Sequence, residues 1–123
     1  MALGKIKADT LEHSTAGSIT TNTLVLSSVK AFVQQDSGTS LNESFNVSSL
    51  TDNSTGRYEV ALTNAFSNAN YSLNVSGGAT SGNCSVDDSH YEAGVMCTRF
   101  YRTDTAAYMD SDHVSMYGVG DLA

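Results

Sequence analysis

The stretch SFNVSSLTDNSTGRYEVALTNAFSNANYSLNV, residues 44–75, alternates apolar and polar side chains on both sides of turn-rich segments. Tyr58, Val60 and Leu62 fall on one face of an extended chain, and polar or small residues fall on the other. This two-residue period is typical of an antiparallel sheet with one buried and one exposed face. Gly56, within the segment TDNSTG, can take the positive φ that a tight reversal needs. The stretch therefore predicts two or three antiparallel strands.

Further short apolar runs along the chain also predict strands. They cover residues 24–26, 29–33, 94–101 and 113–119, and segments rich in Gly, Asn and Ser separate them. Apolar positions do not recur with the sustained 3.6-residue period of a long helix. About six to eight short strands are expected in total. The sequence therefore predicts an all-β fold, a small antiparallel β-sandwich.

The apolar side chains of these strands form the predicted core, but aromatic residues are few. The chain has four Phe, six Tyr and no Trp. We therefore expect a shallow core that neighbouring subunits complete. The residues expected in the core or in an oligomer interface are Phe32, Phe45, Tyr58, Val60, Leu62, Tyr71, Phe100, Val114 and Met116.

The first 22 residues differ from the rest of the chain in the spacing of their apolar residues. Asp9 and Glu12 have the three-residue spacing of a helix cap, which indicates one short helix. The run HSTAGSITTN after them favours an extended arm or a helical turn. Such an arm either stays a disordered tail or becomes ordered on docking to another protein. The predicted division is an N-terminal arm, residues 1–22, and one sandwich domain, residues 23–123.

Charge excludes several classes of partner. The formal net charge is −7, with only six Lys plus Arg. Nucleic-acid binding depends largely on basic side chains that neutralise phosphates, so no nucleic-acid partner is expected. The same balance argues against binding to anionic membranes, and no apolar run is long enough for membrane insertion. The first residues lack the apolar region of a secretory signal, which predicts a protein kept in the cytoplasm.

Two motifs suggest secretion but are better explained otherwise. Six Asn-x-Ser/Thr sequons occur, and without a signal sequence we interpret them as a by-product of a surface rich in Asn, Ser and Thr. Cys84 and Cys97 could pair across a hairpin, yet two cysteines in a cytosolic protein are more often reduced. We therefore expect free thiols.

The longest segments without a strand pattern are residues 77–91 and 102–112, and both are predicted to be exposed loops. Loops of this kind often carry function. Exposed aromatic rings beside amides and acids are typical of glycan or receptor binding. The candidate residues for outward binding loops are Asp87, Asp88, His90, Tyr91 and Tyr108.

The sequence gives little support for catalysis or for a metal site. It contains no Gly-x-Ser-x-Gly elbow or other positioned nucleophile, so an enzyme is not expected. Two acidic clusters lie at residues 87–92 and 110–113, and oxygen-rich loops can hold Ca²⁺. Neither spacing matches a known ion-binding loop, so hydrated acidic loops are the preferred interpretation. We expect no cofactor and no metal.

Several segments together resemble one family of proteins. They are ALGKIKADTLEHSTAGSI near the start, the strand LSSVKAFV, the block SFNVSSLTDNSTGRYEVALTNAFSNANYS and the last strand, which ends in VGD. These segments resemble tail-fibre and appendage proteins of marine bacteriophages, cyanophage-like ones especially. The resemblance covers most of the chain apart from roughly residues 77–111. The segments that carry the resemblance are expected to be structural, and they contain no motif of catalytic or metal-binding residues.

The resemblance implies a virion structural protein, assembled in the host cytoplasm, usually a homotrimer. Its N-terminal segment would attach to other virion proteins of tail, neck or capsid, through Leu3, Ile6 and Leu11. The β-sandwich would face outward for host adhesion, with a cell-surface glycan as one possible receptor. Because the chain is short for a fibre, a capsid-decorating or head or neck-fibre protein stays open as an alternative. A non-viral carbohydrate-binding module is a further alternative.

Overall fold

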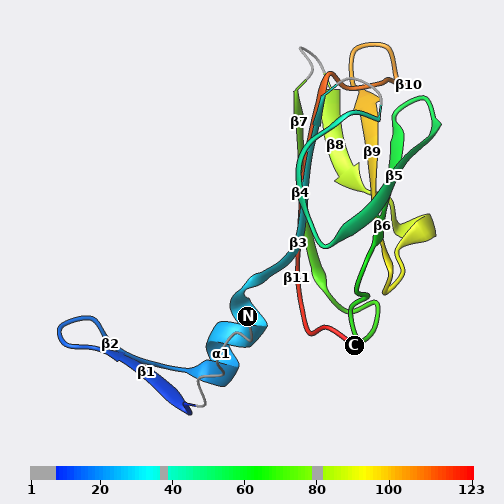
Figure 1. Cartoon of the computed structure of the whole chain (residues 1–123). Helices are drawn as coiled ribbons and strands as arrows, with labels where there is room; N and C mark the ends of the chain where they lie inside the picture. The colour runs from blue at the N-terminus through cyan, green and yellow to red at the C-terminus, as the bar shows by residue number, and fades with distance from the viewer. Residues whose placement is uncertain (1–7, 37–38, 79–81) are drawn as a thin grey trace.

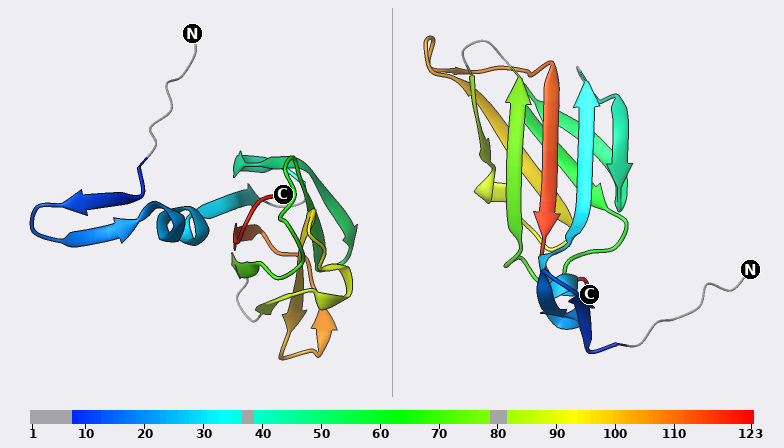
Figure 2. Two further views of the ribbon diagram at one scale, coloured as in Figure 1. Left: turned by 90° about the horizontal axis from the view of Figure 1, so that it is seen from below. Right: turned by 90° about the vertical axis from the view of Figure 1, so that its left-hand side faces the viewer.

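The computed structural model describes residues 8–36, 39–78 and 82–123, and it confirms the predicted all-β sandwich. Two antiparallel sheets stack face to face and enclose the core (Figure 1). A separate two-stranded sheet and a helix extend away from one end of the sandwich (Figure 2). The molecule therefore consists of a sandwich and a projecting N-terminal part.

One layer is a four-stranded sheet with the order β4-β3-β11-β7. Its strands are β3 (Val29–Asp36), β4 (Leu41–Phe45), β7 (Ser72–Gly78) and β11 (His113–Val119). β11 lies in the centre, where Met116 is opposite Val33 on one side and Val75 on the other. β11 has the bounds that the sequence predicts for the last strand.

The other layer is a five-stranded sheet with the path β10-β9-β6-β5, and β8 also pairs with β9. Its strands are β5 (Val47–Ser54), β6 (Arg57–Leu62), β8 (Gly82–Val86), β9 (Val95–Arg102) and β10 (Ala107–Tyr108). β5 and β6 form the predicted hairpin around Gly56, whose φ is +74°. The chain then crosses to the other layer, so β6 and β7 belong to different sheets.

Asn46 forms the corner at which the chain passes from β4 in one sheet to β5 in the other. Its φ of +59° lies in the left-handed region, which Asn tolerates better than most residues. Its side-chain amide donates hydrogen bonds to the carbonyl oxygens of Lys30 and Asn64, at 3.1 and 2.9 Å. Its Oδ1 accepts a hydrogen bond from the Asn64 backbone N–H at 2.8 Å. Both polar groups of the Asn46 sequon residue are therefore used within the fold.

The core lies between the two sheets and contains most of the apolar residues singled out from the sequence. The alternation in β6 is observed as predicted, since Tyr58 and Val60 are fully buried and Leu62 packs beside them. Phe32 is half-buried, and its ring stacks on Phe45 with 6.2 Å between centroids. Phe45 itself is 56% exposed and lies outside the core. The other predicted residues in the core are Tyr71, Phe100, Val114 and Met116.

The N-terminal region differs from the predicted arrangement in two places. The segment with Asp9 and Glu12 was expected to be helical, but β1 (Thr10–His13) and β2 (Gly17–Thr20) form a hairpin there. Residues 24–26 were expected in a strand, but they lie in the helix α1 (Thr21–Ser27). The physical reason is the cap: the Thr20 hydroxyl accepts a hydrogen bond from the Thr23 N–H at 3.1 Å. The predicted domain start at residue 23 therefore falls inside α1, and the first strand of the sandwich begins at Val29.

Both predicted loops contain regular structure. Residues 82–86 form β8, and a short 3-10 helix, η1 (Asp88–His90), follows it. Residues 107–108 form β10, which pairs with the end of β9. Sequence periodicity missed these elements because each is short and polar, and each is fixed by pairing with β9 or by a local cap. The interpretation of residues 77–91 as one long exposed loop was therefore wrong.

Candidate functional site

Two arginines face each other on the outer surface of the five-stranded sheet. Arg57 on β6 and Arg99 on β9 are directly opposite in the antiparallel register. Like charges in this position destabilise a sheet unless another group compensates them. An anion between the two guanidinium groups is therefore required.

Asp87 supplies that anion. Its Oδ2 lies 2.7 Å from Nε of Arg57 and 2.8 Å from Nε of Arg99. The Asp87 side chain is 0% exposed, although it was predicted to lie in an outward loop. The prediction failed because pairing of β8 with β9 brings Asp87 over the arginines, and its N–H donates to the Cys97 carbonyl. Asp87 is thus a structural ion-pair residue.

The charge state of Asp87 follows from competing effects. Burial favours the neutral acid, but hydrogen bonds from Ser89 and Arg99 and the charge of Arg57 outweigh it, so the pKa of Asp87 is lowered. Ser89 donates from its hydroxyl and backbone N–H to Oδ1, at 2.6 and 3.1 Å. Both arginines also donate to the Ser89 hydroxyl. The two guanidinium groups are therefore held in fixed positions.

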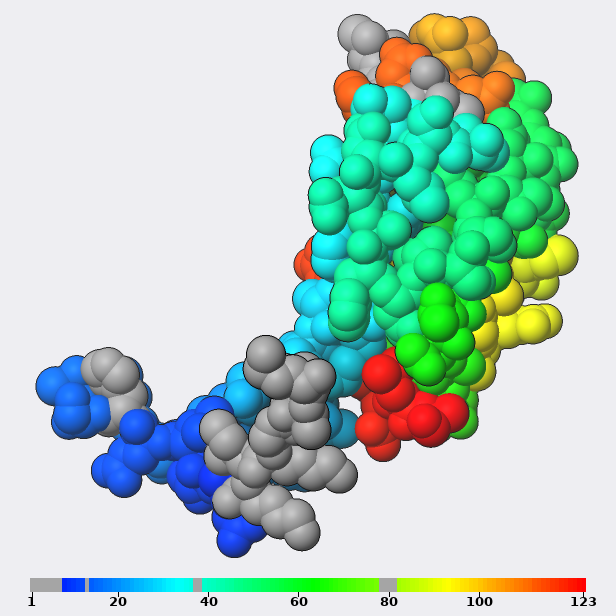
Figure 3. Space-filling model, viewed as in Figure 1, coloured from blue at the N-terminus to red at the C-terminus, as the bar shows by residue number. Residues whose placement is uncertain are grey.

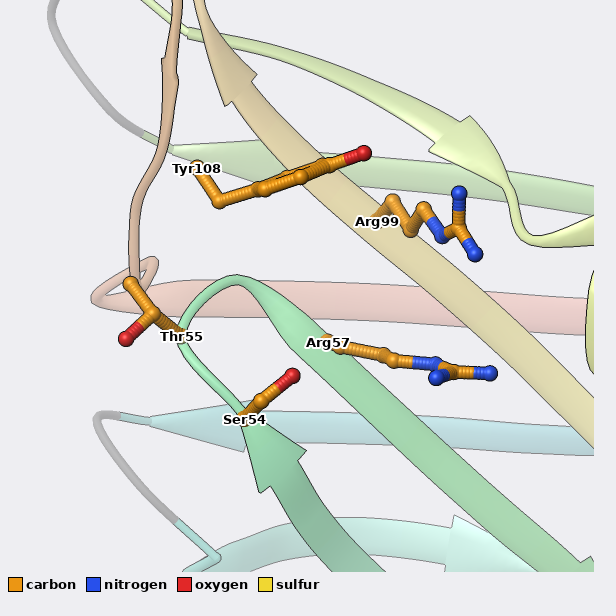
Figure 4. Close-up of a pocket in the computed structure, with 5 residues that line it drawn as sticks. All are labelled: Ser54, Thr55, Arg57, Arg99 and Tyr108. Atoms are coloured by element: carbon orange, nitrogen blue, oxygen red, sulfur yellow. The ribbon is translucent and has the colours of Figure 1, made fainter.

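A shallow pocket of about 140 Å³ lies beside the arginines (Figure 4). Its walls come from the β5–β6 turn, from β6 and β9, and from β10, which carries Tyr108. The Tyr108 ring is 52% exposed and meets Tyr101 edge to face, with centroids 5.6 Å apart. We call this feature the arginine-tyrosine pocket. It is lined by Ser54, Thr55, Arg57, Arg99 and Tyr108.

The turn that forms one wall of the pocket is fastened to its neighbours. The Gly56 N–H donates to Oδ1 of Asp110 at 2.7 Å, and its carbonyl accepts from the Phe100 N–H at 2.7 Å. A Cβ at Gly56 would lie 2.6 Å from the Phe100 carbonyl oxygen and 2.7 Å from that of Met109. Glycine is required there by its positive φ and by this close approach. The pocket is thus part of a packed framework.

Tyr91, another predicted outward residue, packs inward. Its ring stacks on Tyr71 with centroids 4.4 Å apart, and Tyr71 stacks on Phe66 at 4.1 Å. The Tyr91 hydroxyl donates to the Tyr71 carbonyl, and the Tyr71 hydroxyl donates to the Val95 carbonyl at 2.6 Å. Phe66, Tyr71 and Tyr91 thus form a column that closes one end of the core. Sequence alone cannot reveal this stack, because Phe66 and Tyr71 lie in the connection between β6 and β7, whereas Tyr91 lies between η1 and β9.

The remaining candidates, Asp88 and His90, lie at the surface as predicted. His90 has its Nδ1 2.9 Å from Oε1 of Glu59, and His113 has its Nδ1 2.7 Å from Oδ1 of Asp36. Within residues 8–36, 39–78 and 82–123, no three His, Cys, Asp or Glu side chains gather closely enough to hold a metal ion.

The two cysteines are free thiols in the structure, as the sequence predicted. Cys97 is fully buried, and its Sγ donates to the His90 carbonyl. Burial, together with the charges of Glu59 and Asp87, raises the pKa of Cys97 to about 12. A thiol that stays neutral in this way is a poor nucleophile.

The projecting N-terminal part, residues 8–28, is a second candidate site, which we call the arm. Figure 3 shows it extending beyond the sandwich. None of the α1 residues is buried. The predicted attachment residue Leu11 is exposed, whereas Leu3 and Ile6 lie outside the described residues. The exposed large apolar residues of the arm are Leu11, Ile19, Leu24, Val25 and Leu26.

Comparisons with protein-family models, with curated proteins and with solved structures found no match to this chain. Among the residues that the structure describes, no helix is both long and apolar enough to cross a membrane.

Proposed function

We propose that the protein is a structural subunit of a bacteriophage virion, a tail-fibre or appendage protein that assembles as a homotrimer through its arm. The observation that carries this proposal is the arm itself, a hairpin and a helix that present apolar side chains to solvent. The resemblance of several sequence segments to marine phage appendage proteins supports the same class. The sandwich then faces away from the assembled arms and carries the adhesive surface.

The arm is too small to be stable by itself. Isolated helices shorter than about 12–15 residues are marginal in water, and α1 has 7 residues. An isolated two-stranded hairpin is equally marginal. Since neither element buries a core, the arm needs contact with another chain to become stable.

The distribution of apolar side chains around α1 indicates what covers it. Leu24, Val25 and Leu26 are consecutive and exposed, so they point in directions about 100° apart around the helix. A helix that is apolar around much of its circumference is buried on several sides. We infer that the arms of neighbouring copies surround one another, and that the resulting bundle joins the receiving virion protein.

Leu24→Asp is expected to break the assembly. A carboxylate placed in the apolar contact between arms must be desolvated, which weakens association of the copies by at least about tenfold. Leu24 is exposed and is not among the hydrophobic residues packed against the core, so the melting temperature of the sandwich should stay within about 2 °C. Sedimentation equilibrium and thermal unfolding monitored by circular dichroism measure the two effects.

Asn22→Asp is the matched control, because it adds the same charge to an exposed polar position of the same helix. We expect this variant to assemble like the parent protein. Equal association of Leu24→Asp and the parent protein would contradict the proposal.

A further inference from the structure

We propose that the arginine-tyrosine pocket binds one uncharged pyranose ring of a saccharide. The inference rests on the proposed function and names the ligand of its adhesive surface. The pocket lies at the β10 end of the sandwich, and the arm leaves from the opposite end (Figures 1 and 2). Attachment through the arm therefore leaves the pocket free to meet a host surface.

The aromatic wall of the pocket fits a sugar ring. Tyr108 is the aromatic residue that lines the pocket and is 52% exposed, and Tyr101, outside the lining, packs against it edge to face. An exposed ring offers a flat apolar surface to the C–H face of a pyranose, and its hydroxyl offers a polar contact. The pocket, with a volume of about 140 Å³, is open to solvent, so a single sugar ring can rest on the Tyr108 ring without being enclosed.

The polar walls of the pocket supply the groups that sugar hydroxyls need. Ser54 and Thr55 are exposed at the β5–β6 turn, and each hydroxyl can donate and accept a hydrogen bond. Figure 4 shows Tyr108, Arg99 and Arg57 projecting from three separate strands beside this turn. Asp87 and Ser89 already hold both arginines, so their side chains lose little freedom when a ligand binds.

Charge decides between an uncharged and an acidic sugar. Asp87 forms ion pairs with both arginines, and Oε1 of Glu59 lies 3.9 Å from Nη2 of Arg57. Two carboxylates thus balance two guanidinium groups, which leaves no local excess of positive charge. The net charge of −7 on the whole chain also repels acidic polysaccharides. An uncharged pyranose is therefore favoured.

The test is an NMR titration of the full-length, ¹⁵N-labelled protein with the methyl glycosides of glucose, galactose and mannose. We expect saturable shifts of the Thr55, Arg99 and Tyr108 amides for at least one of them, with millimolar affinity. Methyl glucuronide, the acidic probe, should bind no more tightly than the uncharged glycoside that binds best. Absence of saturable shifts with all three uncharged glycosides, or tighter binding of the glucuronide, would overturn the inference.

Tyr108→Ala should weaken the binding by at least about tenfold. Tyr117→Ala is the matched control, because Tyr117 is a similarly exposed tyrosine on β11 of the other sheet. Binding that survives Tyr108→Ala, or that is lost with Tyr117→Ala, would place the ligand elsewhere and overturn the proposal.

These experiments test assembly through the arm and sugar binding by the pocket independently, so that either proposal can be contradicted without the other. A protein that assembles but ignores all three glycosides would contradict the pocket and leave the role of the arm in place. A protein that binds a glycoside but does not assemble would contradict the role of the arm. The Leu24→Asp variant should retain the affinity of the parent protein for the glycoside.

Discussion

Phe100→Ala is expected to lower the free energy of unfolding by about 3–5 kcal/mol, as truncation of a buried aromatic residue usually does. Phe100 is 2% exposed and lies between the two sheets. It meets Tyr58 edge to face, with centroids 6.0 Å apart, and its ring fills the space above Gly77 of the opposite sheet, where a Cβ would overlap it. Since small domains are stable by only about 5–15 kcal/mol, the variant should be close to unfolding.

Urea unfolding followed by circular dichroism measures this effect. Tyr101→Ala is the control, because Tyr101 is the next residue of β9 and faces outward. Its truncation should cost less than about 1 kcal/mol. If Phe100→Ala and Tyr101→Ala had equal urea midpoints of unfolding, the assignment of Phe100 to the core between the two sheets would be wrong.

Asp87→Ala is expected to have the second largest effect, near the lower end of the about 3–5 kcal/mol that loss of one partner costs a buried ion pair. The carboxylate is fully buried and joins Arg57, Arg99 and Ser89. Without it, two facing guanidinium groups on neighbouring strands repel each other. The estimate is at the lower end because both arginines are partly exposed and can be hydrated.

The contribution of Asp87 also gives stability a defined pH dependence. Its pKa is lowered in the folded state relative to an ordinary value of 3.8. As the pH falls through that ordinary value, the unfolded chain takes up the proton first, so the stabilisation by Asp87 declines. The loss is complete only below the folded-state pKa.

Unfolding midpoints between about pH 6 and pH 2 test this linkage. Asp87→Asn should remove the part of the acid slope that Asp87 contributes. Asp88→Asn is the control, since Asp88 is its exposed neighbour. If both variants kept the acid slope of the parent protein, the buried carboxylate would not be its source.

Local patterns explain why the fold was predictable. In β6 and β11 the buried side chains recur every second residue, and this period is set by the geometry of a single strand. The turn at Gly56 depends on one residue that tolerates positive φ. The fold class, the side chains of each strand that face the core, and most of the core residues can therefore be predicted from neighbouring residues alone.

The candidate site depends on contacts that no local pattern contains. The sequence shows Asp87 in a polar run, and it shows Arg57 and Arg99 in two different strand segments, 42 positions apart. Only the pairing of β9 with both β6 and β8 brings the three together. Because Asp87 stands in this polar run, the sequence predicted a hydrated carboxylate there, whereas the structure buries it. Tyr108 was recognised as exposed, but its neighbours in the pocket were not predicted.

The error at residues 21–27 has a different physical origin. Leu24, Val25 and Leu26 have β-forming neighbours, and their apolar run is equally compatible with a short helix or a strand. The N-terminal cap from Thr20 favours the helix. Their exposure has no local explanation, and the proposed contact between arms supplies one.

The molar mass in solution, measured by multi-angle light scattering, tests the central claim most directly. The full-length protein is compared with a chain that begins at Val29, where the first strand of the sandwich starts. We predict three times the 13.0 kDa of one chain for the full-length protein, and a folded single chain without the arm. A full-length protein with the mass of one chain, or an arm-less chain that still forms the trimer, would contradict the account.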